Sequence, residues 1–109
     1  MWDYLSHLYN LTLGDSRFYY LSLIQEEDPK LPKFTIHGLW PQYDLNNYPE
    51  YCKKVNFSIK KIEEIQGELN LYWCSDRGSN ENFWGHEYLK HGSCMFMEIT
   101  ELEYFQKAL

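Results

Sequence analysis

Apolar residues recur at helical spacing in the middle of the chain. Ile59, Ile62, Ile65 and Leu69 lie three or four positions apart, and the hydroxyl of Ser58 ahead of them can cap a helix N-terminus. One apolar face and a polar opposite face are typical of a helix that packs on a core. The pattern therefore predicts a helix that begins after Ser58.

The other elements are predicted from similarly local patterns. Thr100 and Glu103 form a capping box that opens a helix running to Leu109, and a helix over residues 83–91 is expected to close at Gly92. The remaining predictions are a helical stretch over residues 2–13, a strand near 18–25, a polar loop over 26–33, a strand over 34–37 and a loop over 42–52. This mixture indicates an α+β protein with a single domain over residues 1–109.

Two short segments hold three of the four histidines. Residues 34–41 read FTIHGLWP, and residues 83–94 read FWGHEYLKHGSC. The second segment places two histidines around a glutamate and a lysine, and His37 lies in the first segment. Imidazole, carboxylate and ammonium groups gathered in this way indicate a general acid/base site.

The helical positions of the second segment support one shared site. At 100° per residue, relative to His86 at 0°, Lys90 lies at roughly 40°, Glu87 at about 100° and His91 at about 140°. All four side chains then project from one arc of the helix. They can reach one small substrate group.

A zinc site is the obvious alternative for these histidines. Metalloproteases carry H-E-x-x-H, in which two histidines four residues apart share one metal ion. Here His86 and His91 are five residues apart and diverge, Cys94 follows a glycine that ends the helix, and no second histidine pair exists. We expect no metal at this site.

The same residues also have ordinary structural explanations. A lone His37 after Phe-Thr-Ile is typical of a buried histidine at a strand end, and the second segment is what favours a functional role. Glu87 with His91, or His86 with Lys90, can be surface pairs on a helix that contribute tenths of a kcal/mol. His7 has no such context and is expected at the surface.

The two histidine segments resemble the two active-site motifs of the ribonuclease T2 family. Their residue types, order and separation all agree with the family, and the resemblance extends to Tyr48-Pro49-x-x-Cys52 and over roughly residues 17–109. The resemblance implies an antiparallel sheet with packed helices.

The resemblance also implies a role for each residue. His37 would be the general acid that protonates the leaving 5′ oxygen, and His91 the general base that takes the proton of the ribose 2′-OH. Glu87 and Lys90 would stabilise the transition state, and His86 would help to bind the phosphate. The nucleophile belongs to the substrate, so no cofactor is needed, and a chain without 2′-OH groups, such as DNA, cannot react.

Base-binding residues are implied less specifically. Trp40, Gln42 and Tyr48 match one base site of the family and Phe83 another, and aromatic side chains commonly stack on single-stranded RNA. Core packing is an equal alternative for Phe83.

Other residues around these sites are assigned more loosely. Ser75 and Arg77 would line the second base site. Trp73 and Trp84 are expected to pack under the catalytic helix instead of contacting a base.

The chain is shorter than the family's fold requires. It has 109 residues, lacks the family's Gln-Trp-Pro after Gln25, and stops within the helix that Thr100 opens. The C-terminal part of the sheet is therefore expected to be missing, and we interpret the chain as a partial or truncated member. Exposed apolar surface and marginal stability are expected to follow.

Charge and targeting signals add limits of their own. A net charge of −6 argues against a tight nonspecific nucleic-acid binder, although an enzyme needs only a local positive site. Lysines that could contribute are Lys53, Lys54, Lys60, Lys61 and Lys90. No signal peptide or membrane span is visible. Extracellular or endolysosomal localisation, a monomeric state and no membrane association rest on the resemblance.

The cysteines and sequons are compatible with secretion. The resemblance implies a disulfide between Cys52 and Cys94, which leaves Cys74 free. Two N-glycosylation sequons occur, over residues 10–12 and 56–58.

The expected function is that of an endoribonuclease. It would cleave single-stranded RNA to a 2′,3′-cyclic phosphate and then to a 3′-phosphate, without a metal. The alternative is a catalytically inactive T2-like binding module or a non-functional truncated product.

Overall fold

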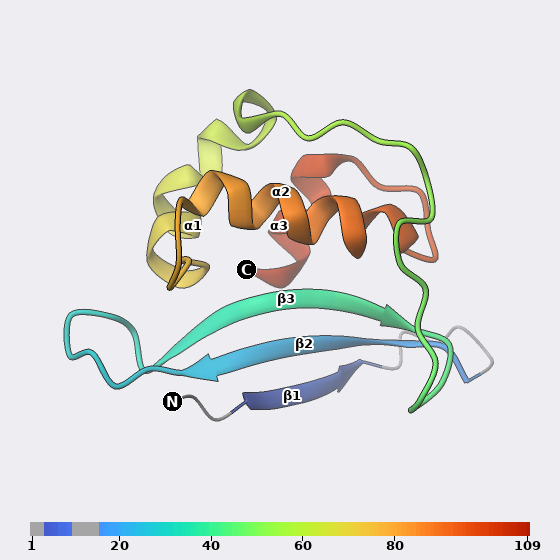
Figure 1. Ribbon diagram of the computed structural model, residues 1–109, viewed down its shortest axis with the longest axis horizontal. Coiled ribbons are helices and arrows are strands. Elements are labelled where there is room, and N and C mark those ends of the chain that lie inside the picture. The colour runs from blue at the N-terminus through green and yellow to red at the C-terminus, as the bar shows by residue number, and fades with distance from the viewer. Residues whose placement is uncertain (1–3, 10–15) are drawn as a thin grey trace.

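A three-stranded antiparallel sheet carries helices on one side. The computed structural model describes residues 4–9, as backbone, and residues 16–109. The strands lie in the order β1-β2-β3 (Figure 1). Their bounds are Tyr4–Tyr9 for β1, Phe18–Gln25 for β2 and Phe34–Gln42 for β3. The predicted α+β class is confirmed.

The first strand corrects the sequence prediction. Residues 2–13 were expected to be helical, whereas β1 pairs with β2 in register from Tyr4 opposite Ile24 to Tyr9 opposite Tyr19. Pairing with β2, which a local prediction does not take into account, makes this segment a strand. Residues 2, 3 and 10–13 lie outside the described part of the chain, as does the side chain of His7.

The second strand has the predicted bounds, but β3 extends five residues past the predicted end at His37 and includes Gln42. Pro41 fits because β3 lies at an edge of the described sheet, where a missing N–H breaks no ladder bond. Residues 38–41, to which no element had been assigned, are therefore sheet, and of the loop predicted over 42–52 only Gln42 belongs to the strand.

The helices begin with a tight turn. The predicted helix after Ser58 is a 3₁₀ helix, η1 (Ile59–Ile65), followed by α1 (Gln66–Tyr72). Ser58 makes no side-chain cap, and its backbone N–H donates to Glu101 Oε1 at 3.0 Å instead. The capping position is correct, but the predicted cap is wrong.

The long helix α2 spans Asn80–Lys90 and begins three residues earlier than predicted. Ser79 caps it by accepting from the N–H of Asn82. Gly92 does not close it in a left-handed conformation. It opens a short 3₁₀ turn, η2 (Gly92–Cys94), and a Cβ there would lie 2.6 Å from Cδ1 of Tyr88. Close packing, not backbone freedom, requires this glycine.

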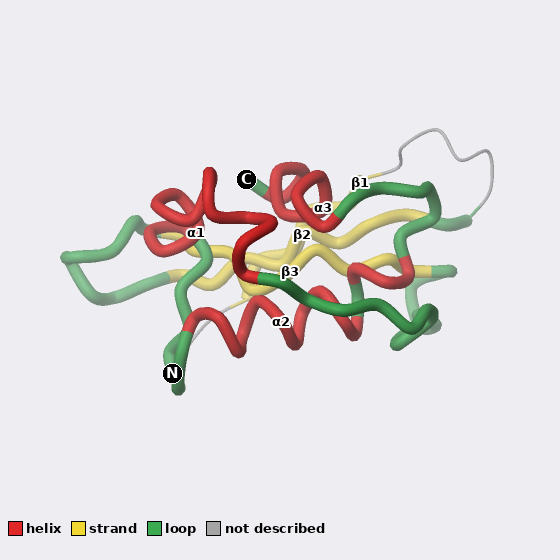
Figure 2. The backbone as a smooth tube through the Cα atoms, turned by 90° about the horizontal axis from the view of Figure 1, so that it is seen from above, coloured by secondary structure: helices red, strands yellow, loops and turns green. Residues whose placement is uncertain are grey.

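The last helix, α3, spans Glu101–Ala108, and its predicted capping box between Thr100 and Glu103 is confirmed. All three helices cover the same face of the sheet (Figure 1). Seen from above, α2 runs along one flank of β3, and α1 and α3 lie along the opposite flank (Figure 2). No helix in the described ranges is long and apolar enough to cross a membrane.

An aromatic core joins the helices to β3. Trp73 and Trp84 are fully buried, as predicted. Trp73 Nε1 donates to the carbonyl of His37 at 3.0 Å, and Tyr104 Oη donates to the carbonyl of Leu39 at 2.9 Å. Two carbonyls of β3 are thus satisfied by helix side chains, which fixes the distance between the strand and the helices.

Candidate active site

A β-bulge on β3 turns His37 toward the helices. Ser22 of β2 faces Gly38 and Leu23 faces Ile36, so His37 is an extra residue without a register partner. A bulge of this kind shifts the alternation of side chains by one position. It explains why His37 and Trp40, three residues apart, line one pocket.

The pocket lies between β3, α2 and the loop after β3, with a volume of about 710 Å³. Eight of the predicted site residues border it together. The lining residues are Tyr20, His37, Trp40, Gln42, Leu45, Asn46, Tyr48, His86, Glu87, Lys90 and His91. The structure therefore brings both histidine segments to one place, as their spacing predicted.

Glu87 is a buried carboxyl group held by an indole. Its side chain is 3% exposed, and its Oε1 accepts from Trp40 Nε1 at 2.8 Å. Burial raises the pKa of Glu87 to about 7, and the Trp40 hydrogen bond and the Lys90 charge only partly offset that effect. Glu87 can thus carry a proton at mildly acidic pH.

His91, the expected general base, has a buried imidazole. It follows the last residue of α2, its ring centroid lies 5.2 Å from that of Trp40, and its Nδ1 has no hydrogen-bond partner among the described residues. Burial, followed by the charges of Lys90 and His86, lowers its pKa to about 3. His91 is therefore neutral at mildly acidic pH, as a base must be.

His37 differs from His91 in having an acidic neighbour. Burial lowers the pKa of His37, while the charge of Asp76 acts in the opposite direction. At His91 burial and the charges of Lys90, His86 and His37 all lower the pKa. The electrostatics therefore make His37 the easier of the two to protonate, which suits an acid.

A histidine and a lysine border the site near the protein surface. The His86 side chain is 53% exposed, and its Nε2 lies 3.9 Å from Glu87 Oε2. Lys90 Nζ lies 3.6 Å from Glu50 Oε2, in the loop after β3. An anionic substrate that binds Lys90 therefore competes with the Glu50 carboxylate for the Lys90 ammonium group.

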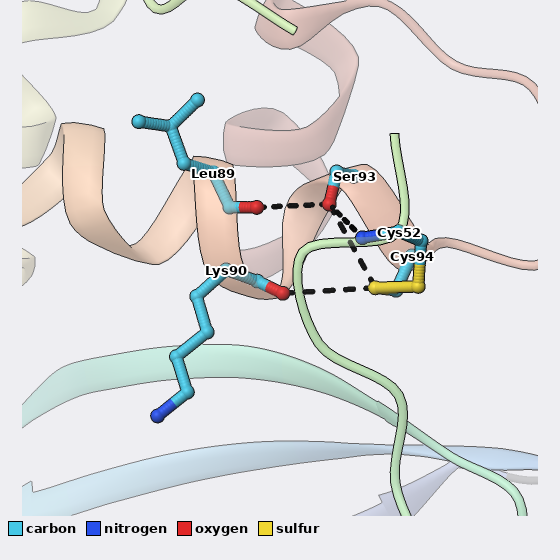
Figure 3. Close-up of a disulfide and its surroundings, with 5 residues drawn as sticks. All are labelled: Cys52, Leu89, Lys90, Ser93 and Cys94. Carbon is cyan, nitrogen blue, oxygen red and sulfur yellow. Dashed lines mark hydrogen bonds between the residues drawn. A yellow bond between two sulfur atoms is a disulfide. The ribbon is translucent and has the colours of Figure 1, made fainter. Parts of the chain in front are cut away.

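The loop that carries Glu50 is tied to the end of α2. Tyr51 donates its N–H to the carbonyl of Lys90 at 2.8 Å, and the N–H of Cys52 donates to Ser93 Oγ at 3.0 Å. The expected disulfide between Cys52 and Cys94 is present (Figure 3). These links fix the loop beside the pocket.

Some of the expected base-binding residues lie elsewhere. Tyr48 borders the pocket and is 52% exposed, whereas Phe83 lies outside the lining. Phe83 packs partly buried against the core, with its ring 5.8 Å from that of His37. Ser75 and Arg77 bond to each other in the loop before α2 and do not border the pocket.

Three other residues of the pocket were not predicted from the sequence. Tyr20 borders it because it faces Trp40 across the β2–β3 pairing. The strand prediction over residues 18–25 contained the signal, but the register could not be known. Leu45 and Asn46 belong to a loop without a motif.

No group of three metal-ligating side chains occurs within residues 16–109. Cys74 is an unpaired cysteine, as expected.

Comparison with known proteins decides the family. Residues 14–109 match the sequence profile of the Ribonuclease T2 family. The chain belongs to this family. Ribonuclease DdI of Dictyostelium discoideum is 42% identical to this T2 member over 74 residues, which cover 66% of the chain and 33% of the relative. Ribonuclease MC of Momordica charantia is 41% identical over 83 residues, which cover 72% of the chain and 42% of the relative.

Solved structures of the T2 family agree with this fold. Ribonuclease MC1 from the seeds of bitter gourd matches with a TM-score of 0.63 and 41% identity, over 69% of this chain and 40% of that one. RNase NT in complex with 5′-AMP matches with a TM-score of 0.65 and 29% identity, over 98% of this chain and 53% of that one. Of the two curated relatives, Ribonuclease DdI and Ribonuclease MC, this T2 member spans less than half the length.

Proposed function

We propose that the chain carries the active site of an endoribonuclease that cleaves single-stranded RNA. The observation that carries this proposal is the single pocket in which two imidazoles of different protonation tendency surround a buried carboxyl group and an ammonium group. Family membership and a structural relative bound to 5′-AMP support a nucleotide ligand.

The first step uses the substrate's own hydroxyl as nucleophile. His91 takes the proton of the 2′-OH, the 2′ oxygen forms a bond to phosphorus, and the bond from phosphorus to the 5′ oxygen breaks. His37 donates its proton to that oxygen, so the products are a 2′,3′-cyclic phosphate and a 5′-OH end. In the slower second step the roles reverse, and water opens the ring to a 3′-phosphate.

The remaining groups stabilise the charge that develops on the phosphoryl oxygens. Lys90 supplies a positive charge, and protonated Glu87 supplies an O–H donor. His86 binds the phosphate near the pocket entrance. The negative charge of the bound phosphate also raises the pKa of both His37 and His91, which brings their titration toward the working pH. No step needs a metal or cofactor.

The substrate's bases would rest on the aromatic side of the pocket. Trp40, Gln42 and Tyr48 line the same pocket as His86 and Lys90 and would form one base site, and Phe83 remains a candidate for a second. DNA lacks the nucleophile and would not be cleaved. We also propose a monomer without membrane association, in an extracellular or endolysosomal setting where the disulfide persists and Asn56 can be glycosylated.

The second candidate is a T2-like module that binds RNA without cleaving it, or a truncated product without function. The chain matches 33% of the length of Ribonuclease DdI and 42% of that of Ribonuclease MC, so the activity of those whole proteins is not carried over to it as a fact. A binding module has no need for both an acid and a base, which is why we place catalysis first.

Cleavage of an RNA oligonucleotide tests the choice. His37→Ala and His91→Ala should each lower the rate by about 10²-fold or more, without a comparable loss of RNA affinity. Lys107→Ala, on exposed α3 surface, is the control and should change little. EDTA should have no effect, and a loss of activity on chelation would revive a metal mechanism. RNA binding without cleavage by the unmodified chain would establish the second candidate.

A further inference from the structure

Gly38 lies beneath the hydrogen bond between Trp40 and Glu87. An added Cβ at this position would come closer than 3.0 Å to both Glu87 Oε1 and Trp40 Nε1, the two atoms that this bond joins. Real Cβ atoms essentially never approach other atoms so closely. A side chain at position 38 and this hydrogen bond are therefore incompatible.

Space, not backbone conformation, makes this glycine necessary. Among the described glycines, a positive φ occurs at Gly78 and not at Gly38. Gly38 faces Ser22 within the β2–β3 ladder, so its backbone is one that alanine can adopt. A substitution by alanine would act through the atoms above it.

The Trp40 ring lies beside both the proposed acid and the proposed base. The Trp40 ring centroid lies 5.0 Å from that of His37 and 5.2 Å from that of His91. Glu87 is buried, and its Oε1 accepts a hydrogen bond from Trp40 Nε1. Moving either partner to admit a methyl group would break the bond and shift the indole between the two imidazoles.

We propose that Gly38 is a positioning residue, whose missing side chain leaves room for the Trp40–Glu87 hydrogen bond that holds the indole beside His37 and His91. This inference rests on the proposed ribonuclease function. Gly38 itself touches no substrate and acts through Trp40 and Glu87.

The test compares Gly38→Ala with Gly67→Ala. Position 67 is a matched control because a Cβ there has no neighbour within 4 Å. In Gly38→Ala we expect kcat to fall at least about tenfold. The hydrogen bond from Trp40 lowers the pKa of Glu87, so its loss should raise that pKa. The limb of the kcat pH profile that reports Glu87 should therefore move to higher pH. Gly67→Ala should retain the wild-type profile.

A second readout does not depend on activity. The indole N–H resonance of Trp40, assigned by its loss in Trp40→Phe, should shift strongly in Gly38→Ala and stay unchanged in Gly67→Ala. If the unmodified chain cleaves no RNA, the proposed function fails, while this resonance still decides the role of Gly38. An unchanged resonance would overturn the inference.

A double variant covers the case in which Gly38→Ala does not fold. In the Trp40→Phe background the hydrogen bond is already absent and Glu87 is free to move aside. The alanine at position 38 should then cost much less activity, or allow folding to return. An equal cost in both backgrounds, or a double variant that also fails to fold, would show that Gly38 serves the strand alone and would overturn the proposal.

Discussion

Replacing Glu87 by glutamine should make the protein more stable at neutral pH while lowering its activity. The side chain is 3% exposed, so its ionised form is poorly solvated. Glutamine has the same shape and can still accept the hydrogen bond from Trp40. The substitution therefore removes a charge without opening a cavity.

The magnitude follows from the pKa of Glu87, which burial raises from 4.5 to about 7. An unfolded chain ionises this group near its ordinary pKa, whereas the folded protein keeps the proton up to about 7. The free energy of unfolding therefore falls as pH rises between these two values and is constant above them. The accumulated loss is about 3 kcal/mol.

Urea unfolding of the disulfide-bonded protein from about pH 4 to pH 8 measures this directly. The stability of Glu87→Gln relative to the unmodified chain should rise by about 3 kcal/mol across that range. The lowered pKa of His91 destabilises the folded state as pH falls below 6.5, but it does so in both proteins and cancels in the difference.

Glu81→Gln is the matched control, because Glu81 is an exposed carboxylate in the first turn of the same helix. It should change stability by only tenths of a kcal/mol at every pH. A difference between Glu87→Gln and the unmodified chain that does not vary with pH would refute the reasoning. It would mean that Glu87 is solvated well enough to ionise normally.

Two further outcomes follow from the loop beside the pocket. Glu50→Gln should tighten inhibition by inorganic phosphate up to about fivefold, because a partly exposed pair such as Glu50–Lys90 is worth at most about 1 kcal/mol; weaker inhibition would contradict it. Peptide mapping should find Cys52 linked to Cys94 and Cys74 open to alkylation, and the link should add about 4 kcal/mol for a separation of 42 residues. A crosslink to Cys74 would disprove this pairing.

Local patterns in the sequence were enough to predict several elements. The bounds of β2 and the capping box at Thr100 depend on neighbouring residues alone. The common position of His86, Glu87 and Lys90 also follows from helix geometry, because a helix fixes the direction of each side chain.

The features that could not be predicted depend on contacts between residues on different elements. Whether residues 4–9 form a strand is decided by their pairing with β2, and the bulge at His37 is decided by the register of Gly38 against Ser22. The sequence shows neither register. The Glu50–Lys90 pair escaped for the same reason, since it joins a loop to a helix 40 residues later.

Product analysis by ³¹P NMR tests the central claim most directly. The purified chain is mixed with a ribodinucleotide, and in parallel with the same dinucleotide lacking the 2′-OH. We predict a transient resonance of the 2′,3′-cyclic phosphate that converts to a 3′-phosphate, with no reaction of the deoxy analogue and no effect of EDTA. Cleavage of the deoxy analogue, or a direct 5′-phosphate product, would contradict the proposed roles of His37 and His91.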